Sequence, residues 1–511
     1  MQKNNYKNIT FQKIIKEIMP LSFILLLAFV IRIWGVGFCL PFRYCHIDES
    51  VVIFYTMRFF GGDFNPYPFF DYPALHLYVL FIIYFFYMIF SGHSPGTFMD
   101  LFMNDPSAVY LIGRAISVIM GVATVYVTYR IAKRLYDEKT GLLASLFMCL
   151  NMEHVLHSHY ATVDVPALFF VMIASMYAIK VFFEGGLKNY ILAGLFTGFA
   201  AATKYYGAVL FVNVMVFYLT GMRSNDARKK VKWYFLLSCA VFLLAGFTIG
   251  APYSMLDFSR FMARFFDRFR LIVNNAPAGA VSIFNKGWFS YPGIMVESTG
   301  WFFTLFSVGS IIYFGIKKEK KYLIPLSFVI VLYLLIGSWQ VSSSRYALPL
   351  YPFFAIINAG FIYSLRQNLK NGRLKKYLVH IFVLILVFTA LPQIIKRDMI
   401  LGSEDTRQTA YKWFIENVPQ GSRVLRLPFT PEFRSGENYR VKVDWDQVIK
   451  DRSIKELKQD YDYVITSSSG NDAESGFEKR LNAEAKILNE FKGKRAGMFH
   501  NPRIRIYSLE K

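Results

Sequence analysis

The chain has 511 residues, of which 54% are hydrophobic, 18% aromatic and only 18% charged. These proportions exclude an ordinary soluble globular protein and indicate an integral membrane protein. The formal net charge of +22 would indicate nucleic-acid binding in a soluble protein, but the Lys and Arg residues occur here in short clusters between apolar runs. That pattern is typical of cytoplasmic loops.

Apolar runs of about 20 residues predict membrane-spanning helices. The N-terminal segment carries Lys3, Lys7, Lys13 and Lys16, so the positive-inside rule places it in the cytoplasm and directs the run 21–40 outward. The other predicted spans are residues 109–129, 142–156, 165–183, 190–202, 207–220, 234–250, 300–316, 323–337, 346–365 and 378–391. With about eleven crossings, every basic cluster between the spans falls on one side.

Two further segments are predicted to lie at the membrane surface. Residues 77–90 form an apolar run of only 14 residues, which indicates an interfacial or re-entrant helix. Residues 257–270 are amphipathic and basic and lie within a long loop, 251–295. The transmembrane region is therefore predicted to cover residues 1–395, with a first extracytoplasmic loop at 41–108.

From residue 396 the composition changes to that of a soluble domain. Helices are predicted at 405–418, with Ser403 or Asp405 as cap, at 445–457 and at 483–491, and strands at 423–427, 461–466 and 504–509. This alternation predicts a small extracytoplasmic α/β domain over 396–511. The four cysteines lie within or beside apolar segments, which favours buried thiols; a Cys39–Cys45 disulfide is the alternative.

This topology brings the costly polar residues to the outer membrane face. A charged residue at that depth needs a partner or a wet cavity, so such residues are candidates for function. The candidates are Asp48, Glu49, Asp71, His76, His154, His157, His159, Asp164, Lys204, Glu297 and Arg345, with Tyr72 and Tyr346 as supporting neighbours.

Each candidate also has an ordinary structural interpretation. The Asp48–Glu49 pair could be hydrated loop carboxylates, and Asp164 could be a helix N-cap. Lys204 could extend its ammonium to the interface, and Arg345 could be an interfacial anchor. The histidines of His154-x-x-His157-x-His159 could bind zinc, but no helix or strand places all three on one face, which favours interfacial histidines.

Taken together, two acidic and two basic sites on one face match the requirements of sugar transfer from a lipid phosphate. A carboxylate accepts the proton of the attacking hydroxyl, and cations stabilise the charge on the departing phosphate. A single displacement of this kind inverts the anomeric carbon.

The order and spacing of the motifs resemble the GT-C membrane glycosyltransferases of the protein O-mannosyltransferase and lipid A aminoarabinose transferase type (family 39-like). The resemblance covers nearly the whole chain. It is carried by Asp48-Glu49, Asp71-x-Pro73-x-Leu75, Gly113-Arg114-x-x-Ser117, Asp164-x-Pro166, Thr203-Lys204, Arg345-Tyr346-x-Leu348-Pro349 and Asp405-Thr406-Arg407.

The resemblance implies a polytopic α-helical GT-C fold in the plasma membrane and a polyprenyl-phosphate monosaccharide donor. It also implies that Asp48, with Glu49, is the catalytic carboxylate, Asp164 a second active-site acid, and Lys204 and Arg345 phosphate ligands. The acceptor would be a protein, lipid or glycan hydroxyl. No cofactor is implied with certainty, and a divalent metal is left open.

One departure limits the comparison with the aminoarabinose transferases. They have Glu-Lys-Pro-Pro in the first loop, whereas this chain has Asp71-Tyr72-Pro73-Ala74. A transporter or flippase of lipid-linked sugars is the main competing hypothesis. It predicts polar or broken helices near the bilayer midplane, whereas the charges here gather at one end of the spans. A GT-C scaffold without activity is a third hypothesis, against which the presence of both Asp48 and Asp164 argues.

Overall fold

The computed structural model describes residues 19–222, 232–274, 287–317, 319–369, 372–434, 437–444, 449, 452–468, 474–497 and 500–509. The predicted cytoplasmic N-terminus and the basic residues 223–231 lie outside the described residues. The chain divides into two compact units, each built from three segments. Unit 1 comprises Met1–Ile33, Gly62–Ile82 and Ile116–Ile394, and unit 2 comprises Trp34–Gly61, Ile83–Ala115 and Ile395–Lys511.

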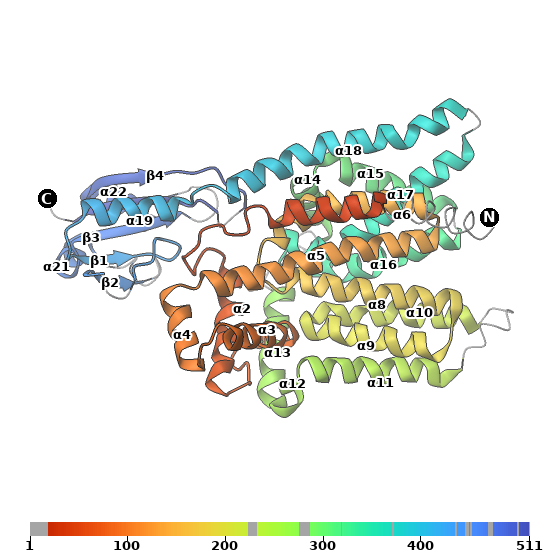
Figure 1. Cartoon of the computed structure of the whole chain (residues 1–511), viewed down its shortest axis with the longest axis horizontal. Coiled ribbons are helices and arrows are strands. Elements are labelled where there is room, and N and C mark those ends of the chain that lie inside the picture. The colour runs from red at the N-terminus through yellow and green to blue at the C-terminus, as the bar shows by residue number, and fades with distance from the viewer. Residues whose placement is uncertain are drawn as a thin grey trace, which may run out of the picture. The chain divides into compact units, whose positions relative to one another are not determined.

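Unit 1 is a bundle of helices, in which α9 packs between α8 and α11 (Figure 1). It includes Met19–Ile33 and parts of α3 (Leu75–Phe90), α5 (Ser107–Leu135) and α18 (Gly372–Leu401). The others are α6 (Glu138–Cys149), α7 (Met152–Ser158), α8 (Asp164–Glu184), α9 (Leu187–Thr203), η2 (Tyr205–Val209), α10 (Leu210–Met222), α11 (Trp233–Gly250), α12 (Tyr253–Leu256), α13 (Phe258–Asn274), α14 (Gly287–Thr299), α15 (Trp301–Lys317), α16 (Lys320–Gly337), η5 (Ser344–Leu350) and α17 (Tyr351–Asn368).

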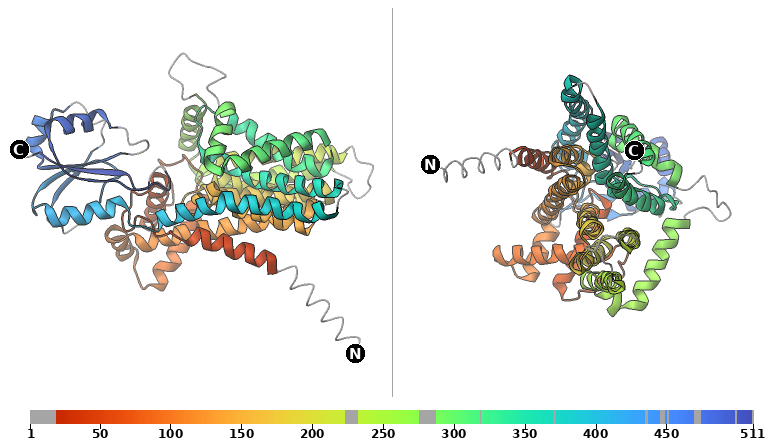
Figure 2. Two further views of the ribbon diagram at one scale, coloured as in Figure 1. Left: turned by 90° about the horizontal axis from the view of Figure 1, so that it is seen from above. Right: turned by 90° about the vertical axis from the view of Figure 1, so that its right-hand side faces the viewer.

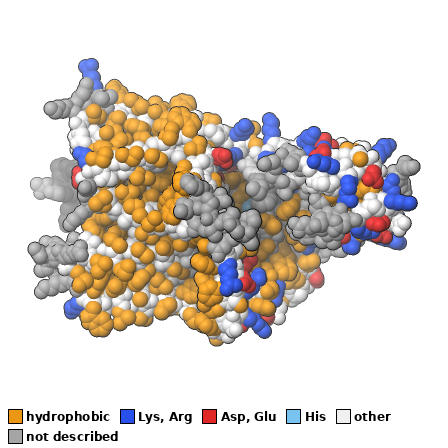
Figure 3. Space-filling view, turned by 180° about the vertical axis from the view of Figure 1, so that it is seen from behind, with side chains coloured by type: hydrophobic (Ala, Val, Ile, Leu, Met, Phe, Trp, Pro, Cys, Tyr) orange, Lys and Arg blue, Asp and Glu red, His pale blue; other side chains and the backbone are white. Residues whose placement is uncertain are grey.

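Within the described residues, six helices are long and apolar enough to cross a membrane, or seven if the bent pair α3 and α4 (Pro95–Asn104) counts as one. Three shorter apolar helices, Met19–Ile33, Trp301–Lys317 and Lys321–Gly337, accompany them. Large hydrophobic side chains such as Phe23, Leu244 and Phe388 are exposed, and hydrophobic side chains cover most of the helical surface visible in Figure 3. This is the surface of a membrane protein; the count of eleven crossings stays a prediction.

Three predicted segments differ from the structure. The predicted span 21–40 is helical only as far as Ile33. The predicted span 142–156 is wrong as a continuous helix, because α6 ends at Cys149 and Asn151 caps α7 by accepting a hydrogen bond from the His154 N–H at 3.0 Å. The predicted loop 251–295 contains three helices, α12, α13 and α14. The amphipathic stretch within it is helical as α13. The apolar run 77–90 forms α3, after which the chain bends by 103° into α4.

Unit 2 contains a five-stranded sheet with the order β2-β1-β3-β5-β4. The first three strands in this order are parallel, and β5 runs antiparallel to both of its neighbours. The strands are β1 (Arg423–Arg426), β2 (Arg440–Val443), β3 (Tyr463–Ser468), β4 (Lys486–Phe491) and β5 (Arg503–Ser508). The helices of unit 2 include α2 (Ile47–Arg58), α4, α19 (Thr406–Asn417), α21 (Ile454–Asp460) and α22 (Gly476–Glu484), with the turn η1 (Phe59–Gly61) after α2.

Helices cover both faces of this sheet (Figure 2). Successive strand residues point to opposite faces, so Val424 packs with Phe414 of α19 while Leu425 packs with Leu457 of α21 and Leu481 of α22. The result is a three-layer α/β arrangement, as the alternation of helices and strands predicts.

The detailed predictions for this region are partly correct. Asp405 caps α19, and β1, β3 and β5 lie where strands are predicted. The predicted helix 483–491 is wrong: α22 ends at Glu484, and Lys486–Phe491 forms β4. Its residues favour a helix locally, but pairing with β5 supplies their main-chain hydrogen bonds instead. Residues 445–448, 450 and 451 of the predicted helix 445–457 lie outside the described residues, and α21 begins only at Ile454.

Candidate active site

The centre of the candidate site in unit 1 is a buried ion pair between Lys204 and Asp164. Asp164 opens α8, whereas Lys204 follows the last turn of α9 in an extended conformation, with φ −153° and ψ 127°. The side chain of Lys204 is only 6% exposed and that of Asp164 only 3%. Because an unpaired charge at this depth is very costly, each group depends on the other.

Lys204 lies at a break between two helices, α9 and η2. The turn η2 folds back closely on α9: a Cβ at Gly207 would lie 2.4 Å from the carbonyl carbon of Ala200. The hydroxyl of Tyr205 donates to the carbonyl of Phe70 at 2.8 Å. This bond ties η2 to the segment that carries Asp71 and Tyr72. The predicted structural alternative, a lysine reaching the interface, is not what the structure shows.

Three tyrosine rings surround the ammonium of Lys204. The Nζ atom lies 5.6 Å from the ring centroid of Tyr72, 5.5 Å from that of Tyr206 and 5.1 Å from that of Tyr346. These distances are within the range of cation–π attraction. Burial, together with the charge of Asp164, raises the pKa of the Tyr72 phenol. Tyr72 therefore stays protonated at neutral pH and can donate a hydrogen bond.

Lys204 and the three tyrosines line a cavity of about 400 Å³. Asp71, Tyr72 and Lys204 supply polar groups to its lining. The rest of the wall is mainly apolar and aromatic, and includes Val209, Phe265, Phe269, Ile272, Leu335 and Trp339. The cavity therefore offers a cationic group beside a long apolar surface, which suits an amphiphilic anion.

A further cation in this cavity, Arg268, was missed by the sequence analysis. It lies on α13, whose face also carries the stacked rings of Phe261, Phe265 and Phe269. One turn earlier, Arg264 forms an ion pair with Asp71 at 3.7 Å. The basic amphipathic stretch 257–270 was the available signal, but periodicity does not show which of its arginines faces a cavity.

His76 is buried, with 1% of its surface exposed, on the first turn of α3. No hydrogen-bond partner for either ring nitrogen is found among the described residues. Arg345 lies on η5, half-buried, 5.5 Å from the ring of its neighbour Tyr346. Glu297 is an exposed residue of α14, and we assign it no role.

The three histidines considered as zinc ligands have separate partners. His154 contacts the buried Arg32 at 2.9 Å, His157 contacts Glu153 at 3.1 Å, and His159 contacts the carbonyl of Val155 at 2.9 Å. All three are buried in the helix packing. In the described part of the chain, no three His, Cys, Asp or Glu side chains form a group that could hold a metal ion, and a divalent metal stays a prediction.

In unit 2, Glu49 is held by Arg114 in an ion pair whose two side chains are 0% exposed. The guanidinium donates to both carboxylate oxygens, at 2.7 and 2.8 Å. Arg114 also donates to the carbonyls of Val36 and Phe38. Asp48 precedes Glu49 in the first turn of α2 and is half-buried. The ion pair with Arg114 anchors α2 through Glu49. Because neighbouring residues of a helix point about 100° apart, the Asp48 side chain leaves the helix in a different direction from that of Glu49.

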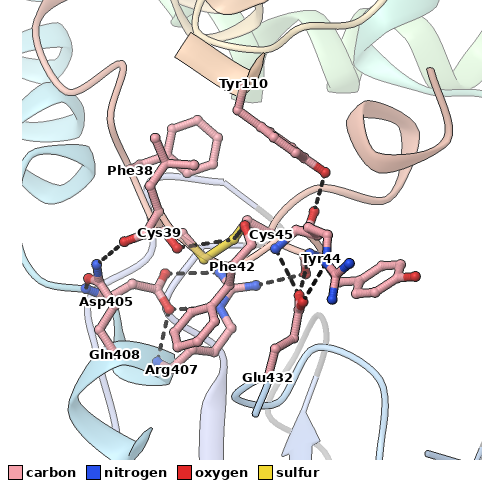
Figure 4. Close-up of a disulfide and its surroundings, with 12 residues drawn as sticks. Phe38, Cys39, Phe42, Tyr44, Cys45, Tyr110, Asp405, Arg407, Gln408 and Glu432 are labelled. Atoms are coloured by element: carbon pink, nitrogen blue, oxygen red, sulfur yellow. Dashed lines mark hydrogen bonds and ion pairs between the residues drawn. A yellow bond between two sulfur atoms is a disulfide. The ribbon is translucent and has the colours of Figure 1, made fainter. Parts of the chain in front are cut away.

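The segment before Asp48 is closed by a disulfide between Cys39 and Cys45 (Figure 4). The favoured prediction of thiols is wrong for these two, whereas Cys149 and Cys239 are buried thiols as predicted. Sequence spacing alone could not show whether Cys39 and Cys45 form a disulfide, because this depends on how the turn between them folds.

Other residues of unit 2 hold the same turn. Glu432 accepts hydrogen bonds from the backbone N–H groups of Arg43 and Tyr44, at 2.8 and 2.9 Å, and pairs with the Arg43 guanidinium (Figure 4). Arg407, bound to Asp405, donates to the carbonyl of Tyr44 at 3.2 Å. Within unit 2, the residues from 395 onward therefore help to position the turn that leads to Asp48.

Removing one partner of the Glu49–Arg114 pair is expected to lower the free energy of unfolding by about 3–5 kcal/mol, because the other charge stays buried. Arg114→Met and Glu49→Gln should each lower the melting temperature of the detergent-purified protein. The double variant Glu49→Gln/Arg114→Met should lose less stability than the sum of the two single changes. Fully additive losses would contradict this coupling.

One family model and one curated relative match part of the chain. The family model described as dolichyl-phosphate-mannose-protein mannosyltransferase matches residues 96–249. An uncharacterized protein from Aquifex aeolicus (strain VF5) is 27% identical over 256 residues, which are 50% of this chain and 48% of that protein. The match therefore spans about half of this relative's length.

Solved structures share the fold over most of the chain. The Archaeoglobus fulgidus oligosaccharyltransferase in the apo form has a TM-score of 0.53 and 12% identity, covering 89% of this chain and 70% of that one. ArnT from Cupriavidus metallidurans bound to undecaprenyl phosphate has a TM-score of 0.52 and 11% identity. The match covers 96% of this chain and 97% of the ArnT chain. The fold is therefore that of a helical membrane protein. More particularly, it is the fold of the GT-C superfamily of membrane glycosyltransferases, and the resemblance predicted from the motifs is confirmed.

Proposed function

We propose that this protein is an inverting glycosyltransferase that moves one monosaccharide from a polyprenyl-phosphate donor to an acceptor hydroxyl. The reaction would take place at the outer face of the plasma membrane, on the side opposite the basic loops. Residues 1–395 would form the catalytic membrane region, and residues 396–511 an extracytoplasmic domain.

The observation that carries this proposal is the cavity of unit 1. Lys204 lines this cavity, buried, paired with Asp164 and surrounded by tyrosines, and apolar and aromatic side chains make up most of the remaining lining. A binding site for a lipid phosphate needs a cation for the phosphate and an apolar surface for the first isoprene units. The volume of about 400 Å³ suits this head portion of the lipid, whereas the remaining chain would lie in the bilayer.

Two solved structures of the same fold support the choice of donor class. ArnT was solved with undecaprenyl phosphate. The oligosaccharyltransferase AglB of Archaeoglobus fulgidus was solved with an inhibitory peptide and a dolichol-phosphate; it has a TM-score of 0.51 and 12% identity, covering 89% of this chain and 70% of that one. We extend the ligand class, a polyprenyl phosphate, to this chain.

We assign the following roles. Lys204 and Arg268, with Arg345, stabilise the charge on the phosphate as it departs, and Asp164 keeps Lys204 charged and in place. Asp48 accepts the acceptor's hydroxyl proton while the new bond forms at the anomeric carbon and the bond to the phosphate oxygen breaks. Glu49 positions Asp48 through its pair with Arg114. Tyr72 and Tyr346 shape the phosphate end, and Asp71 holds α13 through Arg264.

The role of Arg268 tests the proposal. Arg268→Gln should weaken binding of a polyprenyl-phosphate sugar about tenfold or more, because one charge-assisted contact is lost. Arg270→Gln is the matched control, since this arginine is exposed on the same helix and does not line the cavity. Donor affinity can be measured by quenching of intrinsic fluorescence. Equal donor affinity of the Arg268→Gln variant and the wild type would place the phosphate elsewhere.

A further inference from the structure

A second cavity in unit 1, of about 490 Å³, lies between α6, α17 and α18. Its lining includes three basic side chains, Lys139, Arg366 and His380. The apolar part of its wall includes Leu142, Leu143, Ile362 and Val379. None of the described residues that line it is Asp or Glu.

The nearest acidic residues along the chain have other partners. Asp137 accepts a hydrogen bond from the N–H of Thr140 at 2.8 Å and so caps α6. Glu138 forms an ion pair with Lys133 at 3.1 Å. Neither of these two carboxylates is among the residues that line the cavity. The N-terminus of α6, which lies at the cavity, adds the positive end of a helix dipole.

This cavity lies at the far end of α17 from the candidate active site. Tyr346, in the active-site cavity, lies on η5, the turn that immediately precedes α17, whereas Arg366 lies in the last turn of this 18-residue helix. A helix of that length extends about 27 Å, close to the thickness of the hydrocarbon core. The two cavities therefore face opposite ends of the membrane bundle.

We propose that this second cavity binds an anionic phospholipid of the leaflet opposite the active site. Its phosphate would lie among Lys139, Arg366 and His380, and the first carbons of an acyl chain would pack against Leu142 and Ile362. Basic pockets between transmembrane helices on the cytoplasmic side are suited to such headgroups, because anionic lipids concentrate there. The site is separate from the donor cavity, and it does not depend on which sugar is transferred.

The test compares two lipids on the full-length protein in a neutral detergent. Native mass spectrometry should show at least tenfold tighter binding of dioleoylphosphatidylglycerol than of dioleoylphosphatidylcholine. The double variant Lys139→Gln/Arg366→Gln should lose this preference, since each cation near an anionic lipid contributes about fivefold. Arg130→Gln is the control, because Arg130 is an exposed basic residue of α5 outside the cavity.

Equal binding of the two lipids by the wild type would overturn the proposal, as would full retention of the preference by the double variant. Displacement of the bound lipid by millimolar inorganic phosphate would overturn the lipid assignment, because the acyl contacts would then contribute nothing. Should the double variant fail to fold, Lys139→Gln alone decides. This side chain is exposed, and its removal should still weaken phosphatidylglycerol binding about fivefold.

Discussion

Lys204→Met is expected to reduce sugar transfer at least about a hundredfold, because the cation that stabilises the departing phosphate is lost. The same change leaves Asp164 as an unpaired charge that is 2% exposed. It should therefore also lower the free energy of unfolding by about 3–5 kcal/mol. Transfer from a synthetic polyprenyl-phosphate sugar and the melting temperature in detergent measure the two effects separately.

A double variant separates loss of function from loss of fold. Lys204→Met/Asp164→Asn removes both charges of the pair, so that most of the lost stability should return. Transfer should stay absent, since no cation is restored. Recovery of transfer in the double variant would show that Lys204 matters only for stability, and it would remove this residue from the proposed mechanism.

Asp48→Asn is the second change with a large expected effect. Loss of the proposed general base should lower the turnover number by about 10²–10⁴-fold. Donor affinity should stay unchanged, because we assign the phosphate to Lys204 and Arg268. The melting temperature should also stay close to that of the wild type, since the Glu49–Arg114 pair that fixes α2 is intact. Single-turnover assays at saturating donor measure the chemical step directly.

Asp100→Asn provides a matched control for this experiment. Asp100 is an exposed carboxylate on α4 in the same unit, so its loss should leave both turnover and stability unchanged. Normal turnover by the Asp48→Asn variant would exclude Asp48 from the chemistry. A loss of turnover that is matched by a loss of melting temperature would instead indicate a structural role.

The candidate site could be predicted only in part, and the residues themselves show why. Asp164, Lys204 and Tyr346 were candidates because charged and polar side chains beside long apolar runs need a partner or a wet cavity. The structure brings them together with Asp71 and Tyr72. Arg268 was missed because α13 carries several arginines with the same period. Asp48 and Glu49 belong to the other unit, and their convergence with Lys204 stays a prediction.

The buried ion pair of Glu49 could not be predicted from the sequence. Sequence analysis named Asp48 as the catalytic carboxylate and grouped Glu49 with it. Burial of Glu49 against Arg114, 65 positions later in the chain, indicates a positioning role for one of them. Such a pairing leaves no local signal, because neither residue alters the composition or periodicity around it.

The sequence by itself determined the class of protein, the approximate positions of the long apolar helices, the amphipathic α13 and the α/β alternation near the C-terminus. These features depend on composition and on periods of 3.6 and 2 residues, which are local properties. Only the tertiary structure decided that residues 142–156 break into two helices, that Lys486–Phe491 is a strand, and that Cys39 pairs with Cys45. It also decided that the buried Lys204 lines a largely apolar cavity. These outcomes depend on partners distant in sequence, whose hydrogen bonds and burial outweigh local preference.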